Sequence, residues 1–432
     1  MRMFLEPDSL LNLNFHIKGM NWSTATDLPG LPRHRWYFVK EAFSPSLVEQ
    51  AMGAVSHERG DVVLDPFCGS GTSLIAAASK GAITFGCEVN PFLAFVSKTK
   101  LSLGGLYSIV KYRPMVLQGV ERGLKSPLEG NSTFTASGGK KKWLFNTEVV
   151  RSFEGGWVRT ESIPKPARDL LRLALIGAAM DCCNATQDGK CLRYRKDWED
   201  ENFGRDEFID CFEKRTTQIQ EDIKSTPLKD STNRVHWCDC RQRLSTDGIP
   251  KFKLCITSPP YLNSFDYSDI YRPEMFLGKF VSNTNELRAV RLRTIRSHVQ
   301  ASWDPPKEEN FGSLYYNSIT ALRHRQELLW DRRIPLMVQA YFEDMKNILI
   351  RLKKHAHENA QLWIVVSTSA YGGVEIPVDL IIADIAGKVG WRLKEIGVIR
   401  NLRSSAQHFR TIKGENKNPL QLRESAVVLG AN

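Results

Sequence analysis

The chain has 432 residues, enough for one large catalytic domain and an elaborated region. Lys and Arg number 59 against 48 Asp and Glu, and the formal net charge of +11 favours a polyanionic partner. No apolar run reaches transmembrane length, and the N-terminus lacks the apolar core of a signal peptide. These features argue against membrane and secreted proteins, and we expect an intracellular one.

Nine cysteines, an odd number, indicate a reducing compartment. Two groups of cysteines stand out, one within residues 182–191 and one within residues 238–240. Neither group has the paired spacing of a zinc site, so we expect no bound metal.

A glycine-rich turn follows the strand-like run at residues 62–64. It reads Asp65-Pro66-Phe67-Cys68-Gly69-Ser70-Gly71-Thr72. Because Gly69 and Gly71 carry no Cβ, the backbone can adopt positive φ and a ligand can approach the main chain closely. We expect a helix to begin near Thr72, with its first amides directed into a pocket. A phosphate-binding loop is the alternative, but it would need a lysine directly after Gly71.

The next strand-like run, residues 82–87, ends at Glu88. A carboxylate at the end of the second strand of a Rossmann-like unit can accept hydrogen bonds from both ribose hydroxyls of a nucleoside. This position favours a ligand-binding role for Glu88 over that of a surface charge.

A second turn follows the strand-like run at residues 254–256 and reads Thr257-Ser258-Pro259-Pro260-Tyr261. Two consecutive prolines remove two backbone donors and fix two φ angles, so the carbonyls of the turn stay unpaired and rigidly aimed. Ser258 and these carbonyls can accept hydrogen bonds from an amino group while a planar ring stacks on Tyr261. A proline-stiffened loop without a ligand is the alternative.

Two stretches interrupt the strand pattern, at about residues 102–231 and 269–337. The first contains an apolar helical run at residues 170–180, too short and too interrupted by charge to span a bilayer, which we expect to pack on the catalytic domain. The second carries arginines interleaved with aromatic residues: Arg288, Arg291, Arg293, Arg296, Trp303, Tyr315, Tyr316, Arg323, Arg325, Trp330, Arg332 and Arg333. This mixture suits phosphate contact and base stacking, and a solvated helix face is the common alternative.

Apolar runs near residues 62, 83, 235, 254, 362, 391 and 426 make seven strand candidates. Most are separated by helical stretches, which is typical of a mostly parallel sheet in an α/β protein. The last two lie close together and could pair as an antiparallel edge. In open α/β sheets ligands collect at the carboxyl ends of the strands, so the two turns predict a cofactor pocket beside a reaction pocket.

With these two turns the chain resembles the DNA amino-methyltransferases, which methylate the exocyclic nitrogen of cytosine or adenine with S-adenosylmethionine. Residues 65–72 are similar to the family's cofactor motif, and residues 257–261 to its catalytic Ser/Asn/Asp-Pro-Pro-Tyr motif. Residues 33–37 and 43–48 resemble the segment that closes over the methionine end of the cofactor, which nominates Tyr37. Residues 233–239 resemble the strand whose terminal acid meets the adenine ring, which nominates Asp239.

The resemblance covers roughly residues 33–101, 232–268 and 338–430 and implies a Rossmann-like, seven-stranded methyltransferase sheet, mostly parallel with an antiparallel final strand. The two stretches outside it are expected to be inserted, largely helical regions. The expected divisions are 1–101 and 338–432 for the two halves of the catalytic domain, 232–268 for the catalytic motif, 102–231 for a helical insert suited to target recognition, and 269–337 for a second insert suited to DNA contact.

The resemblance also implies the site residues. Those expected to bind S-adenosylmethionine are Tyr37, Asp65, Pro66, Phe67, Cys68, Gly69, Gly71, Thr72, Glu88 and Asp239. Those expected to be catalytic are Ser258, Pro259, Pro260 and Tyr261. No Pro-Cys pair occurs in the sequence, which argues against methylation of cytosine at C5, where a cysteine nucleophile is needed.

The implied substrate is double-stranded DNA with the target base flipped out of the helix. Serine before the two prolines favours cytosine N4, and adenine N6 is the alternative. An RNA amino-methyltransferase and a non-catalytic, methylase-like DNA-binding subunit remain as rivals. We expect a cytoplasmic protein, at the nucleoid when bound to DNA. The target sequence, the oligomeric state and the existence of a cognate restriction nuclease stay open.

Overall fold

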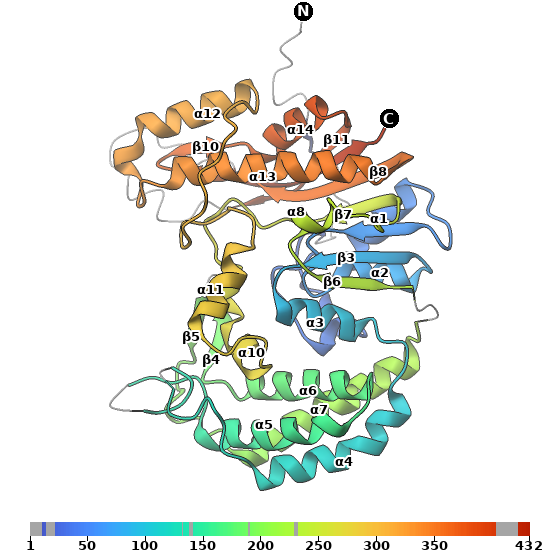
Figure 1. Cartoon of the computed structure of the whole chain (residues 1–432), viewed down its shortest axis with the longest axis vertical. Helices are drawn as coiled ribbons and strands as arrows, with labels where there is room; N and C mark the ends of the chain where they lie inside the picture. Colours follow the sequence, from blue (N-terminus) through green and yellow to red (C-terminus); the bar gives the residue numbers. More distant parts are fainter. Residues whose placement is uncertain are drawn as a thin grey trace, which may run out of the picture.

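A computed structural model describes residues 11–13, 22–131, 133–137, 141–188, 191–228, 232–402 and 422–432. Its largest element is an eight-stranded sheet with the strand order β1-β11-β12-β8-β7-β2-β3-β6 (Figure 1). The strands are β1 (Leu11–Asn12), β2 (Val62–Asp65), β3 (Ile83–Glu88), β6 (Arg234–Trp237), β7 (Phe252–Thr257), β8 (Ala356–Ser367), β11 (Arg392–Leu402) and β12 (Leu422–Gly430).

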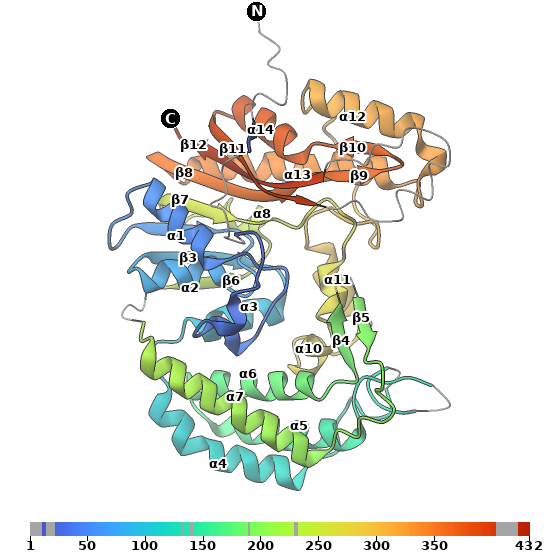
Figure 2. The ribbon, with the colours of Figure 1, turned by 180° about the vertical axis from the view of Figure 1, so that it is seen from behind.

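The strand directions confirm the expected mostly parallel sheet. Strands β6, β3, β2, β7 and β8 run parallel to one another, while β12 is antiparallel to both β8 and β11. The final strand is therefore antiparallel, and it pairs with β11 as expected, but it does not lie at the edge of the sheet. It runs between β8 and β11, as Figure 2 shows from behind, and the two-residue strand β1 extends the sheet beyond the seven expected strands.

The strands are buried on both faces of the sheet. Along β7, Leu254 and Ile256 pack with α1 (Pro45–Ala54) and α2 (Thr72–Ser79), whereas Cys255 packs in the cluster that includes α13 (Ile334–Lys354) and α14 (Val378–Lys388). This alternation follows the two-residue period of a strand. Helices α3 (Pro91–Lys100) and α8 (Cys240–Arg243) follow β3 and β6 directly.

The first insert is helical, as expected, with a small hairpin. Its helices are α4 (Leu106–Arg122), α5 (Thr147–Arg159), α6 (Ala167–Asp181) and α7 (Arg205–Ser225), and its hairpin is β4 (Ala185–Asp188) with β5 (Cys191–Tyr194). A Cβ on Gly119 would lie 2.3 Å from the Gly155 carbonyl oxygen, so glycine permits the close crossing of α4 and α5. Helix α6 contains the predicted apolar run and contacts α3 and α10 (Arg272–Leu277).

The second insert stands between the helical insert and the sheet, with α10 and α11 (Thr284–Leu292) in this position in both views (Figures 1 and 2). It also holds α9 (Tyr267–Ile270) and α12 (Ser313–His324), while the small hairpin of β9 (Ser369–Tyr371) and β10 (Val374–Ile376) follows β8. Two predicted divisions fall inside helices, at 268/269 in α9 and at 337/338 in α13. Helix α13 begins at Ile334, and Pro335 lies in its first turn, where the missing N–H costs nothing.

Within these described ranges, no helix combines the length and the apolar character needed to cross a membrane.

Candidate active site

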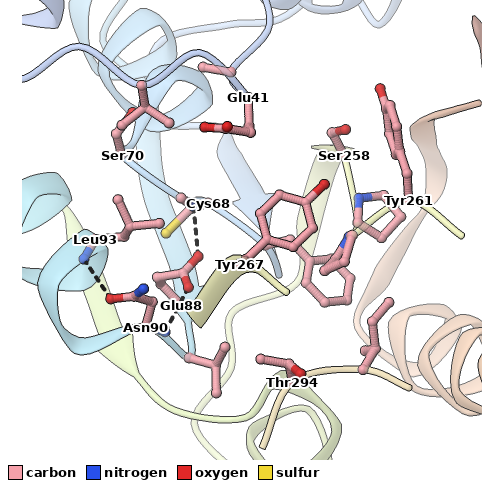
Figure 3. Close-up of a pocket in the computed structure, with 18 of the residues that line it drawn as sticks. Glu41, Cys68, Ser70, Glu88, Asn90, Leu93, Ser258, Tyr261, Tyr267 and Thr294 are labelled. Carbon is pink, nitrogen blue, oxygen red and sulfur yellow. Dashed lines mark hydrogen bonds between the residues drawn. The ribbon is translucent and has the colours of Figure 1, made fainter. Parts of the chain in front are cut away.

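A cavity of about 380 Å³ opens at the carboxyl ends of β2, β3 and β7, and the two motif turns line it together (Figure 3). Its volume lies in the usual range for small-molecule sites, about 300 to 1,000 Å³. The predicted site residues that line it are Asp65, Pro66, Phe67, Cys68, Gly69, Thr72, Glu88, Asp239, Ser258, Pro259, Pro260 and Tyr261. Gly71 and Tyr37 are not among the lining residues.

The two glycines of the first turn have different tasks. Gly69 has φ +50°, and a Cβ at this position would meet no atom within 4 Å, so open space lies beside its backbone. Gly71 has φ +88° and precedes α2, but a Cβ there would lie 2.4 Å from Ser97 Oγ in α3. Gly69 therefore leaves room for a ligand, whereas Gly71 allows close packing behind the turn.

Glu88 ends β3, and its carboxylate faces the cavity while holding the main chain around it. Its Oε2 accepts a hydrogen bond of 2.9 Å from the Gly69 amide, and its Oε1 accepts one of 2.7 Å from the Asn90 amide. Burial raises the pKa of Glu88 to about 7, although these amides act to lower it. Each oxygen keeps a lone pair, so the carboxylate can accept two further hydrogen bonds.

Two buried polar atoms of cavity-lining residues lack a partner within the described part of the chain. Asn90 Oδ1 accepts hydrogen bonds from the amides of Phe92 and Leu93 and so caps α3, which leaves Asn90 Nδ2 unsatisfied. The Ser70 hydroxyl is unsatisfied as well. Both residues line the cavity, where a bound ligand could supply the missing hydrogen bonds.

Asp239 lies at the cavity, but its carboxylate is already engaged. It caps α8 by accepting from the Arg241 amide, and the Arg241 side chain donates to Oδ1 at 3.0 Å and to Oδ2 at 2.8 Å. Arg241 also forms an ion pair of 2.9 Å with Asp344 in α13. The predicted contact of Asp239 with an adenine ring would have to share the carboxylate with Arg241.

The second turn offers acceptors to the cavity. The Ser258 hydroxyl donates to the Val365 carbonyl oxygen at 3.2 Å, so the lone pairs on Ser258 Oγ remain available to accept from an amine. Tyr261 donates its phenolic hydrogen to Glu424 in β12. Burial, and after it the Glu424 carboxylate, raise the pKa of Tyr261 well above its ordinary value, so the phenol stays protonated.

Several cavity residues were missed by the sequence reading. Tyr267 lies between the Glu88 side and the Ser258 side of the cavity in Figure 3, and Tyr271 donates to Glu41 at 2.6 Å. Glu41 lies in the gap between the two N-terminal segments that nominated Tyr37. Tyr37 itself is buried away from the cavity and donates to Glu274 at 2.6 Å. Only spatial proximity reveals these residues, since they carry no motif.

The end of α11 forms another wall of the cavity. Val290, Arg293 and Thr294 line it, and the Arg293 guanidinium lies 5.6 Å from the centre of the Trp237 ring. Arg291 faces away into an ion pair of 2.5 Å with Asp266. Arg293 is therefore accessible from the cavity, whereas Arg291 stabilises the fold through its ion pair with Asp266.

Across the described ranges, no group of three or more His, Cys, Asp or Glu side chains is placed to hold a metal ion.

Sequence comparisons show similarity to a DNA methylase family model and to several methyltransferases. Residues 22–98, which include the first turn and Glu88, match a family model described as DNA methylase. The Type II methyltransferase M.AvaI of Nostoc sp. is 26% identical over 413 residues, covering 85% of this chain and 81% of that protein. M.BsoBI of Geobacillus stearothermophilus, also named a Type II methyltransferase, is 25% identical over 439 residues, covering 86% and 81%. A tRNA (guanine(10)-N2)-dimethyltransferase of Methanocaldococcus jannaschii is 39% identical over 59 residues, covering 14% of this chain and 17% of that protein.

Proposed function

We propose that this chain is a DNA amino-methyltransferase, which methylates an exocyclic amino group of a flipped base in DNA, with cytosine N4 as the favoured position. One observation carries the proposal. The turn after β2, the carboxylate of Glu88 and the turn after β7 line a single cavity, so a cofactor and a base could meet there. Two relatives named Type II methyltransferases, each covering more than four fifths of this chain, support DNA as the substrate.

S-adenosylmethionine is the methyl donor of this family, and the cavity has features that fit it. Glu88 offers free lone pairs to the ribose hydroxyls, and the unsatisfied Asn90 Nδ2 and Ser70 Oγ offer donors. The open space beside Gly69 leaves room for the ligand against the main chain. When bound, the sulfonium supplies an electrophilic methyl group. Asp239 remains the candidate neighbour of the adenine ring.

Ser258 and Pro259 would hold the target amine. An exocyclic amine is a weak nucleophile because its lone pair is delocalised into the ring. Hydrogen bonds from the amine to Ser258 Oγ and to the Pro259 carbonyl would draw the nitrogen toward tetrahedral geometry and localise the pair. Pro260 stiffens the turn, and Tyr261 would stack on the flipped base.

Cytosine N4 is the first candidate because Ser258 precedes the two prolines, and adenine N6 is the second. The short match to a tRNA enzyme gives less support to an RNA substrate than the two long matches give to DNA. Intact Asp65, Glu88, Ser258 and Tyr261 disfavour a non-catalytic subunit. We also propose that the target base is flipped out of the helix, that the protein is cytoplasmic and that it has a cognate restriction nuclease.

The decisive experiment is mass spectrometry of nucleosides from plasmid DNA incubated with purified protein and S-adenosylmethionine. N4-methyldeoxycytidine is the expected product, and N6-methyldeoxyadenosine would select the alternative base. Parallel incubation with bulk tRNA and rRNA tests the RNA rival. Absence of a methylated nucleoside from every substrate would reject the enzymatic function.

A further inference from the structure

The final strand β12 brings a buried carboxylate to the reaction side of the cavity. Glu424 is 1% exposed, lines the cavity and accepts the phenolic hydrogen of Tyr261. The two residues lie far apart in the sequence, and they meet because β12 runs inside the sheet next to β8. Burying an unpaired carboxylate costs folding free energy, so Glu424 needs partners for its charge in the folded protein.

Arg400 of the neighbouring strand β11 supplies the compensating charge. Its Nε lies 2.5 Å from Glu424 Oε2, while Tyr261 uses Oε1. Each oxygen of the carboxylate thus has a separate partner. This arrangement fixes the direction in which Glu424 Oε1 points.

The backbone around Glu424 is also fixed. Arg423 and Ser425 both bind Asp379 of α14, with distances of 2.8 Å from Arg423 Nε and 2.8 Å from Ser425 Oγ. Because side chains alternate along a strand, Glu424 points to the opposite face of the sheet from these two residues. One face of β12 is therefore anchored to a helix, and the other presents a carboxylate to Tyr261.

We propose that Glu424 is a positioning residue for the target base, because its carboxylate, held by Arg400, fixes the ring of Tyr261 that stacks on that base. The proposal rests on the proposed function. The ring of a tyrosine can turn about its side-chain torsions, and an anchored hydroxyl removes that freedom before the base arrives. Since the phenolic hydrogen is committed to Glu424, the Tyr261 oxygen can only accept hydrogen bonds from its other neighbours.

The test is a double-mutant cycle on the DNA substrate that the wild-type protein methylates. Glu424→Ala and Tyr261→Phe should each raise the KM for DNA by roughly three- to tenfold, the usual effect of losing one hydrogen bond. Because both remove the same contact, the double variant should be no worse than the more impaired single variant. Glu424→Gln, which keeps an acceptor oxygen for Tyr261, should recover most of the loss.

S-adenosylmethionine affinity, measured by calorimetry, should stay unchanged in all of these variants. Glu395→Gln, a carboxylate of β11 outside the cavity lining, is the matched control and should leave the KM for DNA unchanged. If Glu424→Ala fails to fold, Tyr261→Phe still decides, because it leaves the Glu424–Arg400 pair in place.

A wild-type KM in Tyr261→Phe, or single effects that multiply in the double variant, would overturn the role of Glu424 while leaving the enzymatic function intact. A wild-type protein that methylates no nucleic acid would instead reject the proposed function, and this inference with it.

Discussion

Thr257 and Asp65 are joined by a hydrogen bond of 2.6 Å, in which Thr257 Oγ1 donates to Asp65 Oδ1. Thr257 ends β7 and Asp65 ends the adjacent strand β2, so the bond ties together the points from which the two motif turns depart. Ser73 and the Phe67 amide donate to the same carboxylate. Asp65 therefore fixes the relative position of the two motif turns, in addition to lining the cavity.

The first prediction concerns Thr257→Val, which removes this donor at similar side-chain volume. Burial raises the pKa of Asp65 to about 6, while hydrogen bonds from Ser73, Thr257 and Phe67 act to lower it. Losing one donor should raise the pKa further and cost about 1 to 3 kcal/mol of unfolding free energy above pH 6. The loss should shrink below pH 6, where the carboxyl is already protonated in the folded wild type. Urea unfolding at about pH 5 and pH 8 measures both values.

Thr84→Val is the matched control for this experiment. Thr84 is equally buried on β3, and its hydroxyl donates to the neutral Asn233 side chain at 2.8 Å. Its loss should be the same at both pH values. An equal loss at both pH values in Thr257→Val would contradict the charged role given to Asp65.

The second prediction concerns the pH dependence of cofactor binding. The pKa of Glu88 is raised to about 7, and hydrogen bonds from ribose hydroxyls would favour its ionised form. The affinity for S-adenosylmethionine should therefore be highest above pH 7 and fall by up to about tenfold per unit below it. Glu88→Ala should weaken binding by about 1 to 3 kcal/mol. Titration calorimetry between about pH 5.5 and 8.5 provides these values.

Asp65 also has a raised pKa, so the two groups must be separated. Glu88→Gln keeps the side-chain size and cannot ionise, and its residual pH dependence reports Asp65. If Glu88→Gln retains the full wild-type pH dependence, Glu88 is not the group that controls binding.

The third prediction concerns DNA contact by the second insert. The sequence indicated DNA contact by the arginines of this insert, but Arg291 is paired with Asp266 and its replacement would damage the fold. Arg288 on α11 is exposed, and no described acidic side chain forms an ion pair with it. If Arg288 contacts a phosphate, Arg288→Ala should reduce the log-log salt slope of DNA binding by about 0.9. Fluorescence anisotropy over a salt series measures the slope.

Arg288→Lys keeps the charge and should retain the wild-type slope. Unchanged affinity and slope in Arg288→Ala would leave this face of α11 as a solvated surface.

The sequence located most of the sheet because each strand is a local apolar run bounded by turn residues. Residues 62–65, 83–88 and 252–257 form strands where the pattern predicted them. The order of the strands is not local information. The placement of β12 between β8 and β11, and the contact of Glu424 with Tyr261 that follows from it, depends on pairing between distant segments.

For the site, too, local features were predicted from the sequence and contacts between distant segments were not. The motif turns were recognisable because glycine and proline restrict the backbone in ways that leave a sequence signature. Tyr37 was nominated from a segment, and the structure instead lines the cavity with nearby Glu41. Arg241 pairs with Asp239, and the two residues are close in sequence. The sequence alone, however, does not distinguish a salt bridge from two charges that do not interact.

The last prediction separates chemistry from binding in the second turn. Ser258→Ala removes an acceptor that matters mainly as the amine nitrogen becomes tetrahedral. The activation barrier for kcat should therefore rise by about 2 to 4 kcal/mol, while the affinity for S-adenosylmethionine is unchanged. Tyr261→Ala should act earlier, costing about 1 to 3 kcal/mol of base stacking, and Tyr261→Phe should recover the ring but not its anchor on Glu424. Single-turnover methylation and calorimetry distinguish these effects. Full methylation by the Ser258→Ala, Tyr261→Ala double variant would mean that the reaction takes place elsewhere in the chain.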